Sequence, residues 1–409
     1  MLLSLRAVLP VLFAVAMLES SISLLNPYVS YLLEQQKVSP VLIGALTSCH
    51  YFGFVIGAFS GPYFIRHLGH IRAAILYAVF GAITVLMHIL FHQVYSWLIL
   101  RFFIGMSIAG MFLVIESWLN AQTKSQWRGQ ILAIYSTISW FFSGIGPIAL
   151  RIEDNGGVII FIIIAVIMIN SMTPLALTRI NPPDVITIKS LGYKKIGQTA
   201  TTAIMACFIA GFIYTPLYSL LPSVTENLAF SKEQLSLLLV LGPLTVIITL
   251  PPIGWLSDRI GRLQVLAFLA TLSSIVAFII FMHRTASYAT TLLLFILLTC
   301  LISPFYSIGL ARAADIIPKN NLVEANALLL IVWGFGAALG PTAAGFVMHI
   351  LDAQALFLFC SLVTLLLSIS ITWIIIRKPC ILDHRQKDFI AMPLSSTPNI
   401  DEVDPHSHR

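Results

Sequence analysis

The stretch GWLSDRIGR, from Gly254 to Arg262, contains three formal charges in nine residues. Long apolar runs flank it, LLLVLGPLTVIITLPPI before it and LQVLAFLATLSSIVAFIIF after it. A related but weaker stretch, GPYFIRHLGH, begins at Gly61. Charges placed between two apolar segments of about 20 residues are typical of a short loop at a membrane surface that joins two spanning helices.

The composition indicates that the solvent of most of the chain is a lipid bilayer. Of its 409 residues, 58% are apolar and 10% are charged, whereas about a quarter of the residues of a soluble domain are charged. Because hydrocarbon offers the backbone no hydrogen-bond partners, the apolar runs must form helices. The sequence therefore predicts an all-α integral membrane protein, and the net charge of +6 does not indicate nucleic-acid binding.

Hydropathy predicts twelve transmembrane helices, and the apolar N-terminal segment is counted as the first of them because it is longer than the core of a secretory signal. The predicted spans are 8–31, 41–64, 72–91, 97–120, 130–150, 158–178, 200–222, 235–256, 263–282, 289–312, 326–348 and 355–376.

The basic residues predict the orientation, because cytoplasmic loops carry an excess of Lys and Arg. With the N-terminus in the cytoplasm, all but five of the 23 Lys and Arg fall in cytoplasmic segments. The exceptions are Lys37, Arg101, Arg151, Lys232 and Arg284. We therefore expect a multi-pass membrane protein with both termini cytoplasmic.

A duplication divides the chain into two pseudo-symmetric halves. Gly61 and Gly254 begin the two related loops 193 residues apart, and the pairs Gly146-Pro147 and Gly340-Pro341 are 194 residues apart. The sequence thus predicts a six-helix bundle at 1–178, a cytoplasmic linker at 179–199, a second six-helix bundle at 200–376 and a disordered cytoplasmic tail at 377–409. Parallel repeats of this kind are typical of alternating-access transporters.

The same residues carry a family resemblance. The pattern G-x-x-x-D-R-x-G-R resembles the signature loop of the major facilitator superfamily, and Arg101 with Gly105 resembles its R-x-x-Q-G motif, with Ile104 in the place of Gln. The stretches VIESWLN, WRGQILAIY and EANALLL are most similar to the YcaD-like bacterial branch. The resemblance implies a location in the bacterial inner membrane and a central cavity lined by spans one, four, seven and ten, and it leaves the substrate open.

The two loops are candidates for a cytoplasmic gate whose contacts form when that side closes. The second copy keeps Asp258, whereas the first has Ile65 at the matching position. We therefore expect Asp258 to carry the larger share of this latch, with arginines pairing with acids across the seam between the halves. The alternative is that the charges only anchor the helix ends. The gate candidates are Gly61, Arg66, Gly69, Gly254, Asp258, Arg259 and Arg262.

Ionisable residues at bilayer depth are the first candidates for function, because burying them is costly. Glu19 lies about 18 Å along the first span and so near the bilayer midplane. Ser23 and Asn26 follow on the same helix face. We expect Glu19 to bind the coupling proton or a cationic group of the substrate, the alternative being a protonated side chain that only packs.

The fourth span adds Arg101 near its outer end and Glu116 toward the cytoplasm, too far apart to pair. The resemblance implies a role for Arg101 in coupling or in binding a substrate anion, and hydrogen bonds to a neighbouring helix are the structural alternative. Glu116 is a gate candidate that could pair with Arg128 or with a loop arginine. His50 and His88 are interpreted as packing residues.

Aromatic residues on four spans are further candidates for lining the cavity, although packing would explain them equally well. They are Trp140, Tyr214, Tyr218, Tyr306 and Trp333.

The sequence contains no P-loop, H-E-x-x-H or G-x-S-x-G motif, so nothing in it indicates an enzyme. Its five cysteines form no metal-type pair, and we expect no metal or cofactor. The resulting interpretation is a monomeric secondary active transporter of a small organic solute, coupled to protons. The alternatives are an uncoupled facilitator or channel and a non-transporting membrane sensor.

Overall fold

The computed structural model describes residues 2–123, 128–152, 158–177, 200–283, 287–318 and 321–377, and within them every regular element is a helix. Twelve of the helical segments are long and apolar enough to cross a membrane. Their positions agree with the twelve predicted spans to within a few residues at most ends, because the length of each apolar run is set by the thickness of the bilayer.

The first half contains six spans. They are α1 (Leu2–Gln35), α2 (Pro40–Leu68), α3 (His70–Leu90), α4 (Val94–Gln122), α5 (Arg128–Ile145) continued by the 3-10 helix η2 (Gly146–Arg151), and α6 (Val158–Leu177).

The second half also contains six spans. They are α8 (Thr201–Ser219) followed by the short α9 (Leu221–Asn227), α10 (Lys232–Ile260), α11 (Arg262–Met282), α12 (Tyr288–Ile302) continued by α13 (Pro304–Ile316), α14 (Leu322–Ile350) and α15 (Ala355–Arg377).

Three predicted spans are interrupted rather than continuous. The fifth changes to a 3-10 helix at Gly146-Pro147, the seventh breaks before Pro222, and the tenth breaks between Ser303 and Pro304. Proline has no backbone N–H, and its ring disfavours a helical conformation in the residue before it. Each break therefore coincides with a proline in the first turn of the new segment.

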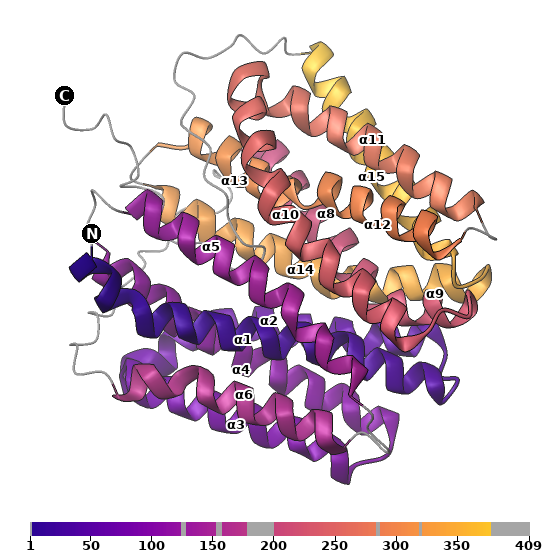
Figure 1. Ribbon diagram of the computed structural model, residues 1–409. Coiled ribbons are helices and arrows are strands. Elements are labelled where there is room, and N and C mark those ends of the chain that lie inside the picture. The colour runs from indigo at the N-terminus through magenta and orange to yellow at the C-terminus, as the bar shows by residue number, and fades with distance from the viewer. Residues whose placement is uncertain are drawn as a thin grey trace.

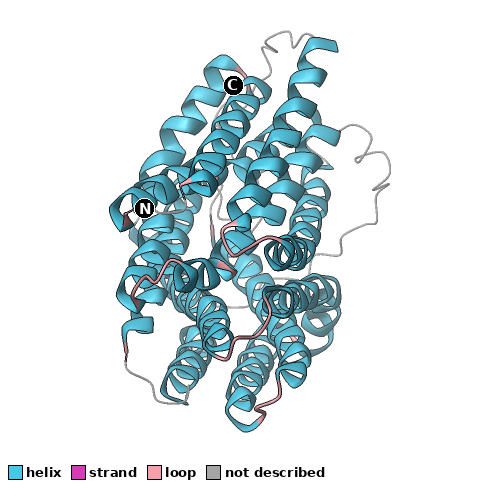
Figure 2. Cartoon of the chain, turned by 90° about the vertical axis from the view of Figure 1, so that its right-hand side faces the viewer, coloured by secondary structure: helices cyan, strands magenta, loops and turns pink. Residues whose placement is uncertain are grey.

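The helices pack as two bundles side by side (Figure 1). In the first, α2 packs on α4, α3 packs on α4 and α6, and α1 packs on α5 and α6. In the second, α11 packs on α12 and α15, and α8 packs on α13 and α14. Figure 2 shows the same helices with the right-hand side of Figure 1 facing the viewer. The predicted two-bundle fold is confirmed, whereas the predicted linker at 179–199 and the tail beyond Arg377 lie outside the described residues.

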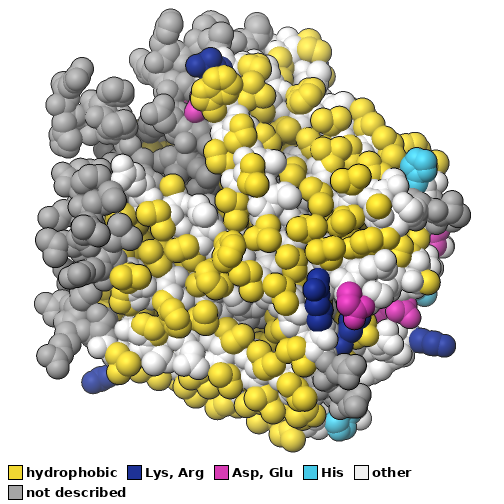
Figure 3. Space-filling model, viewed as in Figure 1, with side chains coloured by type: hydrophobic (Ala, Val, Ile, Leu, Met, Phe, Trp, Pro, Cys, Tyr) yellow, Lys and Arg dark blue, Asp and Glu magenta, His cyan; other side chains and the backbone are white. Residues whose placement is uncertain are grey.

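The surface is the kind that lipid requires. Hydrophobic side chains cover most of the face seen in Figure 3, and charged side chains on it are few. Ile248, in the middle of α10, is 76% exposed. An apolar side chain so exposed in mid-helix, repeated over a whole face, is stable in contact with acyl chains.

The halves meet on one side of the molecule. We call the end that holds Leu2 and Arg377 the termini side, and the opposite end, with Gln35 and α9, the far side (Figure 1). On the far side Thr342 of α14 donates a hydrogen bond to Ser48 of α2, with 2.7 Å between their hydroxyl oxygens. In the predicted orientation the far side is the external one.

The backbones of α2 and α14 approach closely at this seam. A Cβ on Gly44 would lie 2.2 Å from the carbonyl oxygen of Pro341, and one on Gly345 would lie 2.4 Å from that of Pro40. Only glycine allows helices to approach so closely. Nearby, Ser236 of α10 donates to the carbonyl of Pro147 at 3.0 Å, so the two halves are in tight contact on the far side.

Candidate functional site

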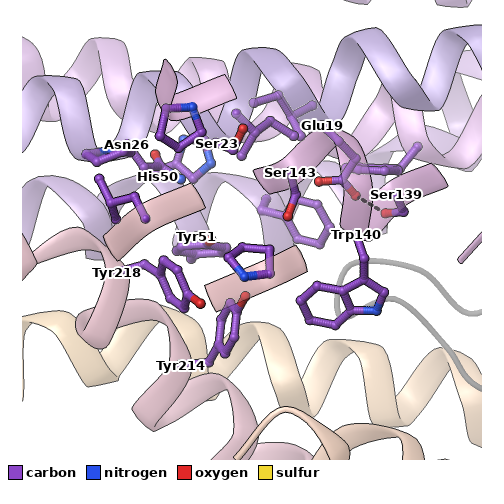
Figure 4. Close-up of a pocket in the computed structure, with 18 of the residues that line it drawn as sticks. Glu19, Ser23, Asn26, His50, Tyr51, Ser139, Trp140, Ser143, Tyr214 and Tyr218 are labelled. Atoms are coloured by element: carbon purple, nitrogen blue, oxygen red, sulfur yellow. Dashed lines mark hydrogen bonds between the residues drawn. The ribbon is translucent and has the colours of Figure 1, made fainter. Parts of the chain in front are cut away.

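A cavity lies between the halves at mid-depth, with about 870 Å³ of empty space counting the part open to solvent. Helices α1, α2, α4 and α5 with η2 line it from the first half, and α8, α10 and α14 line it from the second. Its polar and aromatic lining is drawn in Figure 4. The cavity therefore has walls from both bundles, as a site at the interface of two repeats requires.

Glu19 is part of the cavity wall and is 8% exposed. Its Oε1 accepts a hydrogen bond of 2.6 Å from Ser139 of α5 (Figure 4). The neighbouring Ser20, Ser21 and Ser23 each donate to a carbonyl of their own helix. Ser20 also lies 3.4 Å from the carbonyl oxygen of Phe142 on α5, so both Glu19 and Ser20 connect α1 to that helix.

Arg101 and Asn26 form a second polar group in the first half. Arg101 is completely buried, and its Nη2 donates to Oδ1 of Asn26. Among the described residues, Nε and Nη1 of Arg101 have no hydrogen-bond partner. Asn26 lines the cavity, as does His50, whereas Arg101 does not and reaches it through Asn26.

The aromatic part of the wall is shared between the bundles. Trp140 of α5 meets Tyr214 of α8 edge-on, with 6.1 Å between ring centroids, and Tyr214 lies 4.6 Å from Tyr218. Tyr51 of α2 meets Trp333 of α14 edge-on at 5.7 Å. Aromatic rings at these distances stabilise one another and offer a surface on which a flat ligand can pack.

Tyr306 does not line the cavity. It is fully buried behind Trp333, with 6.2 Å between ring centroids. The cavity lining within the described residues includes no side chain from the tenth span and instead draws on spans two, five, eight and eleven. The lining implied by the family resemblance is therefore matched for spans one, four and seven only. The reason is that the Tyr306 segment packs on α8, where Cys207 contacts the carbonyl of Tyr306 at 3.9 Å.

Glu116 lies away from the cavity lining, buried on α4 toward the termini side. It interacts electrostatically with Tyr306 of the other half. The side chain of Arg128, its expected partner, is outside the described residues. A gate role for Glu116 therefore stays a prediction.

The second loop forms an ion network inside its own half. The buried Arg262, at the start of α11, contacts Asp258 of α10 at 2.5 Å and Asp315 of α13 at 2.9 Å. Arg259 lies over the ring of Trp255 at 4.0 Å. In this conformation the described ion pairs of Arg262 connect α10, α11 and α13, three helices of the second bundle. We had expected the loop arginines to pair with acids of the other bundle.

The first loop carries no matching network among the described residues. Arg66 is exposed, and the buried Ile65 replaces the acid. Gly61 is buried where a Cβ would meet the side chain of Leu113 of α4, and Gly69 adopts φ 80° between α2 and α3. The buried Gly254 lies one turn before Asp258. The asymmetry between the loops, predicted from the sequence, is present in their contacts.

Three hydroxyl-bearing lining residues were missed by sequence reasoning. Ser139 and Ser143 flank Trp140 on α5 at a spacing of four, which places both on one helix face, and this spacing was a usable signal. Tyr51 directly follows His50 and lies one turn after Thr47 and Ser48 on α2, and it was not singled out. His50, interpreted as a packing residue, does line the cavity.

Twelve spanning helices in two six-helix halves around a central cavity define the protein as a multi-pass membrane transporter of a small molecule. A sequence model described as the Major Facilitator Superfamily matches residues 11–198 and 202–397, so the chain belongs to that superfamily.

Relatives support the predicted branch. An uncharacterised MFS-type transporter of Yersinia enterocolitica is 26% identical over 392 residues, which cover 95% of this chain and 99% of the relative. The uncharacterised MFS-type transporter YcaD of Escherichia coli is 26% identical over 367 residues, 88% of this chain and 93% of YcaD. The similarity to the YcaD-like bacterial transporters is confirmed.

Solved structures share the fold. The nucleoside transporter NupG has a TM-score of 0.71 and 15% identity, covering 91% of this chain and 99% of NupG. A D-xylose-proton symporter has a TM-score of 0.72 and 13% identity, covering 90% and 97%. Identities this low establish the architecture and leave the substrate open.

Proposed function

We propose that the protein is a secondary active transporter that moves a small organic solute by alternating access, with Glu19 as the group that binds the coupling proton. The observation that carries the proposal is the position of this carboxylate, which is almost buried, lines the cavity and is hydrogen-bonded to Ser139. A carboxylate at bilayer depth is costly when charged, and protonation removes that cost.

Proton coupling fits the groups around Glu19. Two titratable side chains that interact with it electrostatically are Tyr51 of α2 and Tyr214 of α8, both of which carry no charge at neutral pH. A carboxylate that lies among neutral side chains at bilayer depth is suited to bind a proton, and this supports the proton as the coupling ion. The D-xylose-proton symporter, which shares the fold, is by its name a proton-coupled protein.

Alternating access fits the contacts that close the far side. The far side is held by backbone-close contacts between α2 and α14 and by polar contacts between η2 and α10. Opening that side requires these contacts to break, and we propose that the loops near Asp258 and Arg66 then bring the termini side together. With cytoplasmic termini, the present conformation corresponds to closure toward the outside.

The test uses purified protein in liposomes with an imposed pH gradient and a metabolite extract as the solute source. Mass spectrometry identifies solutes that accumulate only when protein and gradient are both present. In the Glu19→Gln variant we expect gradient-driven accumulation to fall by about tenfold or more, because the proton site is lost. Glu233→Gln is the matched control, since Glu233 is exposed at the start of α10.

Each other outcome rejects part of the proposal. Equal accumulation in Glu19→Gln and the unaltered protein would exclude Glu19 as the coupling site. Protein-dependent flux that does not change with the pH gradient would indicate an uncoupled facilitator. Complete absence of flux would favour the non-transporting sensor.

A further inference from the structure

The charge of the cavity wall is unbalanced. Among its described lining residues, Glu19 is the single Asp, Glu, Lys or Arg side chain. The other polar lining groups are hydroxyls, one amide and one imidazole, contributed by Ser23, Asn26, His50, Ser139, Ser143, Tyr51, Tyr214 and Tyr218. A ligand that enters while Glu19 is ionised therefore meets a wall with one negative charge.

The nearest positive charge is set back from the cavity. Arg101 is fully buried and contacts the wall through Asn26. Asn26 follows Glu19 by seven residues on α1, which is about 10 Å along the helix. The Glu19 carboxylate and the Asn26–Arg101 pair thus lie at different depths along α1. A cation is favoured at the depth of Glu19.

The wall is also aromatic, with rings from both bundles. Trp140 and Tyr214 touch across the seam, and Trp140 directly follows Ser139, the hydrogen-bond partner of Glu19. Figure 4 shows the carboxylate and the Trp140 ring at the same end of the cavity. The faces of Trp and Tyr rings attract cations, and they also pack against flat apolar ligands.

We propose that the substrate is an aromatic amine, a flat ring system that carries one ammonium group. The ammonium group donates to the Glu19 carboxylate, and the ring packs on the Trp140–Tyr214 pair. This inference rests on the proposed transport function and names its substrate class. Because the aromatic pair includes one residue from each half, a ligand bound there contacts both bundles at once.

The test compares four compounds that share one indole ring and differ in charge: tryptamine, neutral indole, indole-3-acetate and zwitterionic tryptophan. Their binding to the purified full chain in detergent is measured by calorimetric titration near neutral pH. We expect tryptamine to bind about tenfold or more tightly than the other three, because only it gains a charge-assisted hydrogen bond without adding a negative charge.

Three variants locate the binding. Glu19→Gln, close to the original in shape, should reduce tryptamine affinity about tenfold and leave indole affinity unchanged. Trp140→Leu should weaken both compounds, since the ring contact is lost. Trp373→Leu is the control, because Trp373 is 55% exposed on the lipid-facing side of α15. Far-ultraviolet circular dichroism checks that each variant is folded.

The contrary results are specific. If tryptophan or indole-3-acetate bound more tightly than tryptamine, the ligand would be recognised through a carboxylate near Asn26 and Arg101, and the proposal would be overturned. The absence of binding by all four compounds would also overturn it. An accumulated solute of another class in the liposome assay would refute the aromatic amine and leave transport standing. Tryptamine binding without any flux would refute transport and leave the ligand assignment standing.

Discussion

At the scale of single residues, Arg262 is a buried cation that forms ion pairs with two aspartates. Its side chain is 1% exposed and lies between Asp258, which is 28% exposed, and Asp315, which is 8% exposed. It also donates to the hydroxyl of Ser257 at 3.0 Å. A buried ion that loses its partner is far more costly than a surface ion that does so.

Replacing Arg262 by Ala should therefore destabilise the protein by about 3–5 kcal/mol, because the buried Asp315 and the partly exposed Asp258 would both lose their ion pair with Arg262. Arg259→Ala removes an arginine three positions away that stacks on an exposed Trp255, and should cost about 1 kcal/mol or less. Thermal unfolding in detergent measures both. A similar loss of stability in the two variants would show that the ion pairs of Arg262 do not stabilise the fold.

At the scale of elements, the contact between α2 and α14 depends on Gly44. A larger side chain there collides with a backbone carbonyl that cannot move independently of its helix. Gly334 of α14 differs, because a Cβ there would meet only a methyl group of Val55 at 2.7 Å. A substitution at Gly334 therefore serves as the control for a substitution at Gly44.

Gly44→Val should push α2 and α14 apart and open the far side, with a loss of about 1–3 kcal/mol in stability. In a background without native cysteines, Ser48→Cys then reports the opening through its reaction with a membrane-impermeant maleimide, applied to each membrane face in turn. We expect its labelling rate to rise severalfold in Gly44→Val and little in Gly334→Ala. Equal rates in both would show that the contact does not hold the far side closed.

Elements also show what the sequence could predict. The spans were predictable because the thickness of the bilayer sets their length. The loop between α10 and α11 was predictable because its charged residues lie close together in the sequence. The partner of Arg262 on α13 was not predictable in this way, since Asp315 is 53 residues away along the chain. Nor was the side of each helix that faces the cavity, because hydropathy does not distinguish lipid from the protein interior.

At the scale of the whole molecule, the proposed cycle requires the far side to separate. Ser48 and Thr342 lie across the seam with hydroxyl oxygens 2.7 Å apart, which brings their β-carbons near the distance of a disulfide. Neither residue of this pair lines the cavity. A cross-link there can therefore restrain motion without occupying the binding site.

Ser48→Cys combined with Thr342→Cys, in the cysteine-free background, should lose most transport on oxidation and regain it on reduction. Each single variant should remain active under both conditions. Solute flux in liposomes measures the effect, with cross-linking yield followed by electrophoresis. Full transport at complete cross-linking would show that the halves need not separate at this seam.

The break at Pro304 has a mechanical consequence. It makes α13 a rigid rod of 13 residues, with Tyr306 near one end, against the back of Trp333, and Asp315 near the other, held by Arg262. The two side chains are nine residues, or about 13 Å, apart. A movement of Asp315 together with Arg262 would therefore displace the segment whose Tyr306 packs against Trp333 of the cavity wall.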